Sequence, residues 1–246
     1  MSKMKCVVFD SYNETVFNQI QDFLAKNKQA NIFQSPFFFR AYLQTNNIKP
    51  LYFVSYKGNK IVAVLLAYIV KEKMGPLSFF TSRCVVDGGP VIEDGNLEVI
   101  DFLLDELVKR VKRKSIYILF RNFEDFDMKK PVFLKNGFEY IEHLNILFDL
   151  QKSEEQLWKE VHSKRRNEIR KAIKNNVTFE EGNNEGALKR GYEILLSVYQ
   201  RAGLPLLEYS FFKLLFDSSD QANGLKIFCA VHNSQIIGVM FTLVYK

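Results

Sequence analysis

The sequence contains few of the residues on which metal-binding, disulfide-bonded and membrane-spanning proteins depend. Its three cysteines, Cys6, Cys84 and Cys229, lie far apart and form no CxxC pair, which argues against a disulfide scaffold or a dithiol redox motif. The three histidines lack the spacing of a zinc site. The longest apolar run, residues 61–70, is too short to cross a bilayer, and the start of the chain has no secretion-signal pattern. We therefore expect reduced thiols, no bound metal and a cytoplasmic location.

The overall composition is that of a soluble globular protein with an anionic partner. The 246 residues are 47% hydrophobic and 25% charged, and this length suits one large domain or two small ones. The formal net charge is +6 and the isoelectric point is about 9.0. A basic protein of this kind attracts anions, and nucleic acid, phosphorylated substrates and an anionic membrane surface all satisfy that condition.

Much of the positive charge lies in one helical segment, residues 153–176. Ser153 with Gln156 three residues later forms a capping box, which predicts the start of a helix. Seven lysines and arginines but only two glutamates lie between residues 159 and 174. In one continuous helix Arg165 would point into the apolar stripe. Either the helix breaks near Ser163, which would cap a second helix, or Arg165 faces an anion in a cleft, or the segment is simply a solvated basic face.

The first 150 residues predict a complete mixed α/β domain. Apolar periodicity and turn residues give the order β-α-α-β-β-β-α-β-α-β. The predicted strands are residues 5–9, 51–56, 60–70, 77–80, 115–120 and 140–150, and the predicted helices are residues 15–26, 36–45, 97–111 and 131–135.

Residues 151–246 predict the basic connector and the opening part of a second domain. A strand at 177–180, helices at 185–202 and 210–216, and strands at 225–231 and 236–244 repeat the element order with which the first domain begins. Nothing equivalent to the remainder of the first domain follows. A last strand at the end of the chain is an open edge, so either the chain is a fragment or another chain completes the sheet. We favour the fragment.

Five stretches together resemble the FemABX family, whose members contain two tandem GNAT-like acyltransferase domains. They are residues 32–42, 88–94, 163–182, 201–216 and 228–245. The resemblance implies an α/β fold with two such domains, the second truncated. It also implies an enzyme that takes an amino acid from aminoacyl-tRNA and joins it through an amide bond to the peptide stem of a peptidoglycan precursor. Aminoacyl-tRNA would be a co-substrate, with no other cofactor. The protein would work in the cytoplasm, with possible peripheral contact at the inner face of the membrane.

The same resemblance suggests substrate-binding residues but no catalytic residue. Arg40 matches a position that contacts substrate phosphate, and Asn122 matches a position in the cleft; a surface arginine and a loop cap are the ordinary alternatives. Arg165, Arg166 and Arg170 are candidates for the phosphates of the precursor or of tRNA, because guanidinium groups bind phosphate in pairs of hydrogen bonds. The chain shows no Ser-His-Asp or Cys-His arrangement. The part of the second domain that carries a lysine implicated in the family's chemistry has no counterpart here.

Two other functions remain open at the level of the sequence. A CoA-dependent N-acyltransferase acting on envelope polysaccharide or lipid would use acetyl-CoA or another acyl-CoA. The loop at residues 200–205 half-resembles a CoA pyrophosphate loop, but it follows a helix and Pro205 has no N–H to donate. The absence of a convincing CoA loop favours aminoacyl-tRNA as the donor. A non-catalytic protein that binds RNA or an anionic surface through residues 159–174 is the alternative outside the enzymes.

Overall fold

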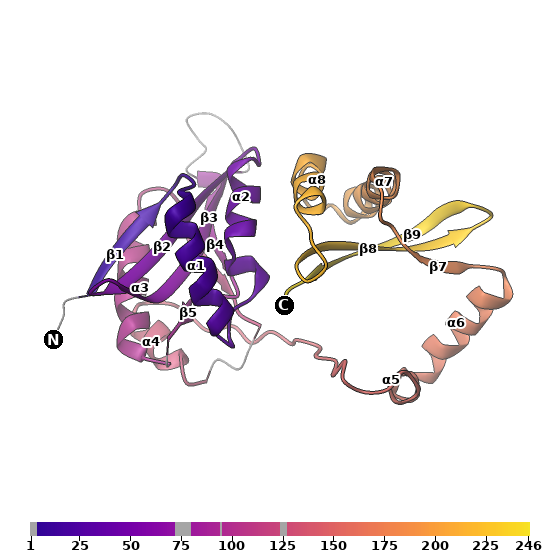
Figure 1. Ribbon diagram of the computed structural model, residues 1–246, viewed down its shortest axis with the longest axis horizontal. Helices are drawn as coiled ribbons and strands as arrows, with labels where there is room; N and C mark the ends of the chain where they lie inside the picture. The colour runs from indigo at the N-terminus through magenta and orange to yellow at the C-terminus, as the bar shows by residue number, and fades with distance from the viewer. Residues whose placement is uncertain (1–3, 72–79, 94, 124–126) are drawn as a thin grey trace. The chain divides into compact units, whose positions relative to one another are not determined.

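The computed structural model divides the chain into two compact units (Figure 1). The first contains Met1–Glu142 with Tyr245–Lys246, and the second contains His143–Val244, whereas the sequence placed the boundary after residue 150. The structure describes residues 4–71, 80–93, 95–123 and 127–246. No helix within these residues is long and apolar enough to cross a bilayer.

The first unit is built on a mixed sheet in the order β1-β2-β3-β4-β6, with β5 paired to β3. Among the strands of the described residues, β4 and β6 run parallel and the other pairs are antiparallel. The strands are β1 (Met4–Phe9), β2 (Ile48–Lys57), β3 (Lys60–Lys71), β4 (Ser82–Asp87), β5 (Val91–Ile92) and β6 (Ile118–Arg121).

Helices cover both faces of this sheet (Figure 1). On one face lie α1 (Glu14–Lys26) and α2 (Pro36–Leu43), preceded by the 3-10 turn η1 (Ile32–Gln34), and their aromatic side chains pack on Tyr52 of β2. On the other face, the apolar stripe of α3 (Leu97–Val111) packs with α4 (Lys130–Lys135) in a continuous buried core. Side-chain caps from Asn13, Ser35 and Asn96 start α1, α2 and α3 where the sequence predicted helices.

The second unit has a three-stranded antiparallel sheet in the order β7-β8-β9. Its elements are α5 (Glu154–Glu160), α6 (Ser163–Lys174), β7 (Thr178–Glu181), α7 (Glu185–Ala202), α8 (Tyr209–Asp217), β8 (Gly224–His232) and β9 (Gln235–Val244). Both α7 and α8 lie on one face of this sheet (Figure 1). Gly191 allows α7 to approach closely, since a Cβ there would lie 2.8 Å from the ring of Phe241.

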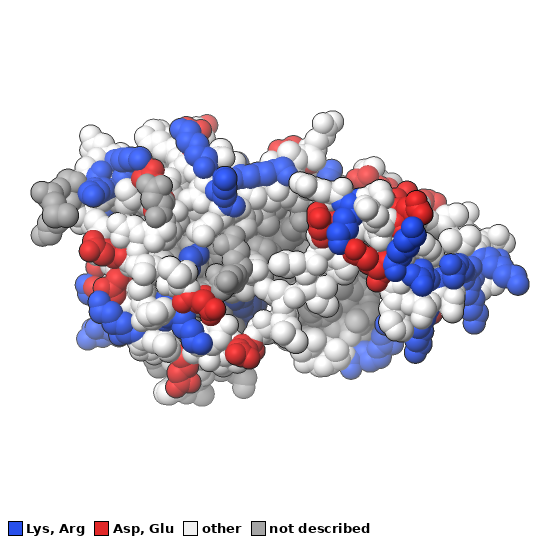
Figure 2. Space-filling view, turned by 90° about the horizontal axis from the view of Figure 1, so that it is seen from below, with Lys and Arg blue, Asp and Glu red and all other residues white. Residues whose placement is uncertain are grey.

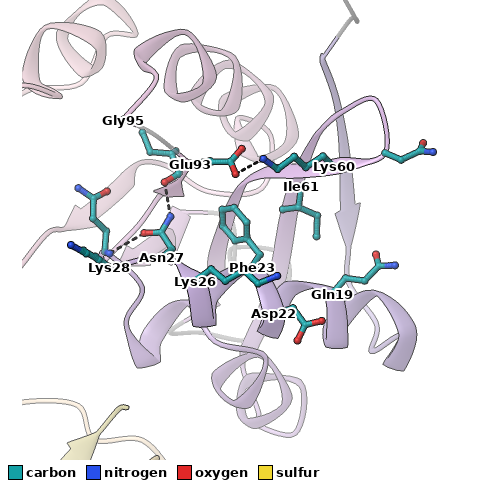
Figure 3. Close-up of a pocket in the computed structure, with 13 residues that line it drawn as sticks. Gln19, Asp22, Phe23, Lys26, Asn27, Lys28, Lys60, Ile61, Glu93 and Gly95 are labelled. Atoms are coloured by element: carbon teal, nitrogen blue, oxygen red, sulfur yellow. Dashed lines mark hydrogen bonds and ion pairs between the residues drawn. The ribbon is translucent and has the colours of Figure 1, made fainter.

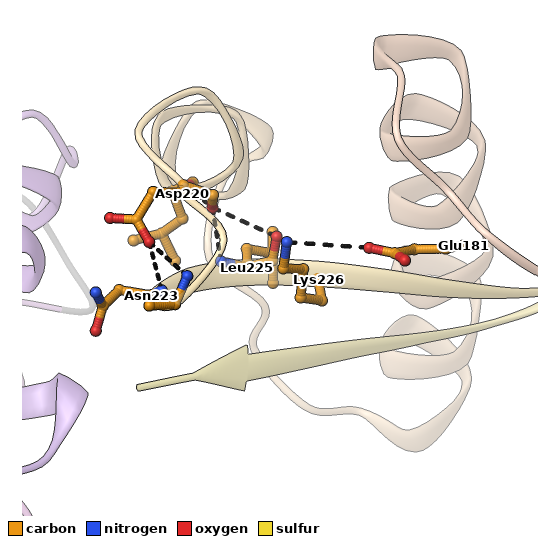
Figure 4. Close-up of polar contacts among 8 residues, drawn as sticks. Glu181, Asp220, Asn223, Leu225 and Lys226 are labelled. Atoms are coloured by element: carbon orange, nitrogen blue, oxygen red, sulfur yellow. Dashed lines mark hydrogen bonds and ion pairs between the residues drawn. The ribbon is translucent and has the colours of Figure 1, made fainter. Parts of the chain in front are cut away.

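The turn between α8 and β8 is held by side chains that bond to the backbone (Figure 4). The Asp220 carboxylate accepts hydrogen bonds from the backbone N–H groups of Ala222 and Asn223, both at 2.7 Å, and these bonds lower its pKa. Ser219 Oγ accepts from Leu225 N at 2.8 Å and donates to Leu215 O at 2.7 Å. These contacts fix the start of β8 and explain the polar cluster there as structural.

The predicted strand at residues 140–150 is wrong, because no strand pairing forms there. Its apolar side chains are exposed, with Leu144 at 93% and Leu147 at 84%. The alternating pattern describes a half-buried strand, but a strand also needs a neighbour for its N–H and C=O groups. The predicted strand at 77–80 lies outside the described residues except for Phe80. The sequence also missed β4 and β5, which flank the turn at residues 88–90.

The basic segment is broken into two helices, α5 and α6, as the first of the three alternatives drawn from the sequence proposed. The capping box at Ser153 starts α5 as predicted. The cap of α6 is His162, whose ring nitrogen accepts from Lys164 N, so the prediction that Ser163 would be the cap is wrong by one residue. Because of the break, the orientation of Arg165 is set by α6 alone.

Candidate functional site

The strongest candidate site lies where the parallel strands β4 and β6 end. Asp87 and Arg121 are opposite each other in the last register position of this pair. Arg121 Nη1 lies 3.6 Å from Asp87 Oδ1, and the Tyr68 hydroxyl donates to Asp87 Oδ2 at 2.8 Å. Tyr42 stacks on the ring of Tyr68 at 4.3 Å. These four residues, called the Asp87 cluster below, occupy the end of parallel strands where α/β proteins commonly bind ligands.

Gln34 holds the backbone on which Asp87 sits. It is fully buried, and its Nε2 donates to Leu66 O at 3.2 Å and to Asp87 O at 2.8 Å. Its Oε1 accepts from Leu66 N at 2.7 Å. On this side of β3, β5 pairs with residues 63 and 64 and β4 with residues 68 to 71. The side chain of Gln34 therefore bonds to the backbone N–H and C=O of Leu66, which lies in β3 between the residues that pair with β5 and those that pair with β4.

The turn after Asp87 is packed so tightly that only glycine fits. Gly88 has a φ of +64°, and a Cβ there would lie 2.7 Å from Asn31 Nδ2. A Cβ on Gly89 would lie 2.8 Å from the amide of Gln34. Asn31 Nδ2 donates to Gly88 O at 2.6 Å, and Gly88 N donates to Arg121 O at 2.8 Å. The hydrogen bonds of Gly88 to Asn31 and to Arg121 therefore hold the backbone next to Asp87 in place.

The environment of Asp87 makes it a better proton acceptor than a free carboxylate. Burial raises the pKa of Asp87, while the hydrogen bond from Tyr68 and the charge of Arg121 lower it by less. Its side chain is 10% exposed, whereas that of Arg121 is 56% exposed. The cluster therefore offers a nearly buried carboxylate for a proton or an ammonium group, and beside it an open guanidinium for a carboxylate or phosphate.

Two of the sequence-predicted binding residues lie in the first unit. Arg40 is exposed in the last turn of α2, with its guanidinium carbon 4.9 Å from the centre of the Tyr12 ring. Asn122 is half-buried and follows Arg121 directly, so it lies at the same end of β6 as the Asp87 cluster. Of the two, the structure brings only Asn122 next to a member of that cluster.

The three arginines of α6 have different surroundings. Arg165 is exposed and pairs with Glu168 at 2.6 Å. Arg166 Nη1 donates to Lys159 O at 2.8 Å and to Trp158 O at 3.3 Å, which satisfies carbonyls at the end of α5. Arg170 lies over the Trp158 ring, 5.6 Å from its centre. Arg166 and Arg170 thus join α6 to α5, and Arg165 faces solvent.

The cysteines do not have the surroundings of a nucleophile. Burial raises the pKa of Cys84 to about 12 and that of Cys6 to about 11, and it also raises the pKa of Cys229. A thiol is reactive as its thiolate, which these shifts disfavour. Within the described part of the chain, no group of three or more His, Cys, Asp or Glu side chains is arranged to hold a metal ion.

The first unit also has a cavity of about 600 Å³ between the end of α1, the β2–β3 turn and β5 (Figure 3). Phe23 and Ile61 contribute apolar surface to it. At one rim Lys60 Nζ pairs with Glu93 Oε1 at 2.6 Å, and Asn27 Nδ2 donates to Ile92 O at 2.6 Å. These polar groups already bond to one another, so the Asp87 cluster remains the better candidate.

Sequence reasoning missed the Asp87 cluster because β4 was not recognised as a strand. Residues 87–90 lie outside every predicted strand and helix, and a loop carboxylate gives no signal of burial. The available signal was the pair Gly88-Gly89, since glycines next to an acidic residue mark a close approach of backbone.

The sequence matches no protein-family model, and no curated protein matches it. Among solved structures, the chain is similar to the crystal structure of FemX, with a TM-score of 0.61 and 15% identity over 91% of this chain and 57% of FemX. The chain therefore has a FemX-like mixed α/β fold, as predicted, and spans less than two thirds of the length of FemX. Weaker likenesses include a ribosomal-protein-alanine N-acetyltransferase from Brucella melitensis biovar Abortus 2308, with a TM-score of 0.41 and 13% identity over 59% of this chain and all (100%) of that chain. The aminoglycoside N-acetyltransferase AAC(6')-Iy in complex with CoA has a TM-score of 0.44 and 12% identity over 61% of this chain and 97% of that chain.

Proposed function

We propose that this chain, with its FemX-like fold, is part of an acyltransferase that moves an amino acid from aminoacyl-tRNA to an amine of a peptidoglycan precursor. The FemABX resemblance of the sequence supports the donor and the acceptor, and the FemX-like fold supports the reaction class. The single observation that carries the proposal is the Asp87 cluster, a nearly buried carboxylate beside an exposed guanidinium.

The reaction needs a base, and Asp87 is proposed to be that base. Attack of the acceptor amine on the aminoacyl ester forms a C–N bond and breaks the ester C–O bond. Asp87 takes the proton that the amine loses and returns a proton to the leaving hydroxyl oxygen, so the step is balanced. The raised pKa of Asp87 brings it closer to the pKa of an amine than an ordinary carboxylate would be. Tyr68 holds the carboxylate in place through its hydroxyl.

Arg121 is proposed to bind a carboxylate of the acceptor. A peptide stem carries carboxylates near its free amine, and a guanidinium binds such a group with two hydrogen bonds. Arg121 and Asp87 are adjacent, so one can hold the carboxylate while the other receives the amine. The proposed reaction uses aminoacyl-tRNA as a co-substrate and needs no cofactor.

The test is an amide-transfer assay with the full chain, a set of aminoacyl-tRNAs and a peptidoglycan precursor. Asp87→Asn keeps the shape of the side chain and removes the base, so kcat/KM should fall by about 10²- to 10⁴-fold. Asp105→Asn is the matched control, because Asp105 is an exposed carboxylate on α3 that pairs with Lys109. Its rate should stay within about twofold of the unmodified protein, since surface changes have small effects. Full activity of Asp87→Asn, or transfer from acetyl-CoA in place of aminoacyl-tRNA, would overturn the proposal.

A further inference from the structure

We propose that three lysines of α6, Lys164, Lys171 and Lys174, form a surface that binds the phosphate backbone of RNA. This lysine surface rests on the proposed function, in which an aminoacyl-tRNA is the donor. It assigns the contact with that RNA to the lysines of α6, whereas the resemblance suggested Arg165, Arg166 and Arg170 for the phosphates of the precursor or of tRNA. Blue side chains gather over the part of the second unit that contains α6 (Figure 2).

Helical geometry places the three lysines on one side of α6. Residues seven and ten positions apart differ in direction by about 20° and 80°, and Lys171 and Lys174 lie about 10 Å and 15 Å along the axis from Lys164. All three are exposed. Among the described residues, no carboxylate lies within ion-pair distance of their ammonium groups, whereas nearby Lys152, Lys159 and Arg165 each pair with a glutamate. The lysine surface therefore keeps its full charge for a ligand.

Two of the three arginines of α6 contact α5 and hold the lysine surface in position. Arg166 satisfies two carbonyls of α5, and Arg170 lies over Trp158 of the same helix. Viewed down the helix axis, the directions of these two arginines differ from those of the three lysines by roughly 40° to 160°. The contact with α5 consequently leaves the lysine surface uncovered by that helix.

The chemistry of α6 favours RNA over a membrane. A helix that lies in a membrane interface has a broad apolar face beside its cations. On α6 the exposed apolar side chains are Ile169 and Ile173, on the side away from the lysines, and the exposed Arg165 lies next to Ile169 on that side. No residue of α6 is buried. Charge without a matching apolar face suits a ligand whose affinity comes from phosphates.

The experiment measures the binding of deacylated tRNA to the full chain by fluorescence anisotropy over a range of KCl concentrations. The triple variant K164Q/K171Q/K174Q removes three charges and keeps residues with similar helix propensity. R110Q/K112Q/R113Q removes the same charge from the end of α3 in the first unit and is the matched control. If each lysine neutralises one phosphate, the slope of log K against log salt should become shallower by about 2 to 3 in the lysine variant. The control should keep the original slope.

Equal slopes for the lysine variant and the unmodified protein would overturn the proposal. So would a lysine variant that loses binding to vesicles containing phosphatidylglycerol while its tRNA binding stays unchanged, because the surface would then face a membrane. Circular dichroism establishes that the variants fold; if the triple variant does not, K171Q alone should change the slope by about 0.8. Deacylated tRNA needs no acyl transfer to bind. Transfer from aminoacyl-tRNA with an unchanged slope would therefore refute this surface alone, whereas transfer from acetyl-CoA alone would refute the proposed function.

Discussion

Replacing Gln34 by alanine should destabilise the first unit more than any exposed glutamine substitution. The buried side chain of Gln34 bonds to three backbone groups: Leu66 N–H at 2.7 Å, Leu66 C=O at 3.2 Å and Asp87 C=O at 2.8 Å. In the alanine variant all three lose their partner in a site with no exposed surface.

The size of the effect follows from the cost of unpaired buried polar groups. Each costs about 1 to 3 kcal/mol, and groups that share one partner do not contribute independently. We therefore expect the free energy of unfolding to fall by about 3 to 4 kcal/mol. In a protein of this size, 1 kcal/mol shifts the melting temperature by about 2 to 4 °C, so the midpoint should fall by roughly 10 °C.

Urea unfolding followed by far-UV circular dichroism measures this change. The chain has one tryptophan, Trp158 of α5, so tryptophan fluorescence follows the second unit separately. Gln44→Ala is the matched control, because Gln44 is an exposed glutamine at the end of α2, and it should change stability by less than about 0.5 kcal/mol. A loss of less than about 1 kcal/mol in Gln34→Ala would refute the reasoning, because the three backbone groups would then have other partners.

Three further predictions concern the site and the basic helices. Arg121→Ala removes a cation that lowers the pKa of Asp87, so that pKa should rise and the low-pH limb of the kcat/KM profile should move to higher pH; a shift to lower pH would contradict the assigned role. Gly88→Ala forces a Cβ within 2.7 Å of Asn31, and thermal melting should show a larger loss than the about 1 to 2 kcal/mol of Gly58→Ala, which has the same φ of +64° but open space; equal losses would show that the turn can relax. Arg166→Ala removes two hydrogen bonds to carbonyls of α5 and should lower the stability of the second unit by about 1 kcal/mol in urea unfolding monitored by tryptophan fluorescence, whereas no change would show that water replaces the guanidinium.

Local rules predicted the helices well because their signals lie within a few residues. The capping box at Ser153 and the Ser35-Pro36 start of α2 appear where the sequence placed them. The apolar stripe of α3 gave its bounds correctly, since the helical period extends over the whole of residues 97–111. A helix satisfies its own backbone, so its pattern contains most of what determines it.

Strands and the site were harder, because each depends on residues far away in the chain. Residues 140–150 alternate like a strand but have no pairing partner among the described residues. The Asp87 cluster forms only when β3, β4, β6 and α2 come together, and Gln34 was not singled out because a buried glutamine has no distinguishing local pattern. Helical phase set Arg165 apart from Arg166 and Arg170 in the sequence, but only the break before Ser163 shows that Arg165 faces solvent.

The backbone N–H of Leu66 lies in a strand, but its hydrogen-bond acceptor is the side chain of Gln34. Its exchange with deuterium would therefore report the rotation of one glutamine about its χ angles, at the centre of a unit whose neighbouring amides exchange only when strands separate. The exchange rate of the Leu66 amide therefore reports whether the Gln34 side chain, which also bonds to Asp87 O, is in place.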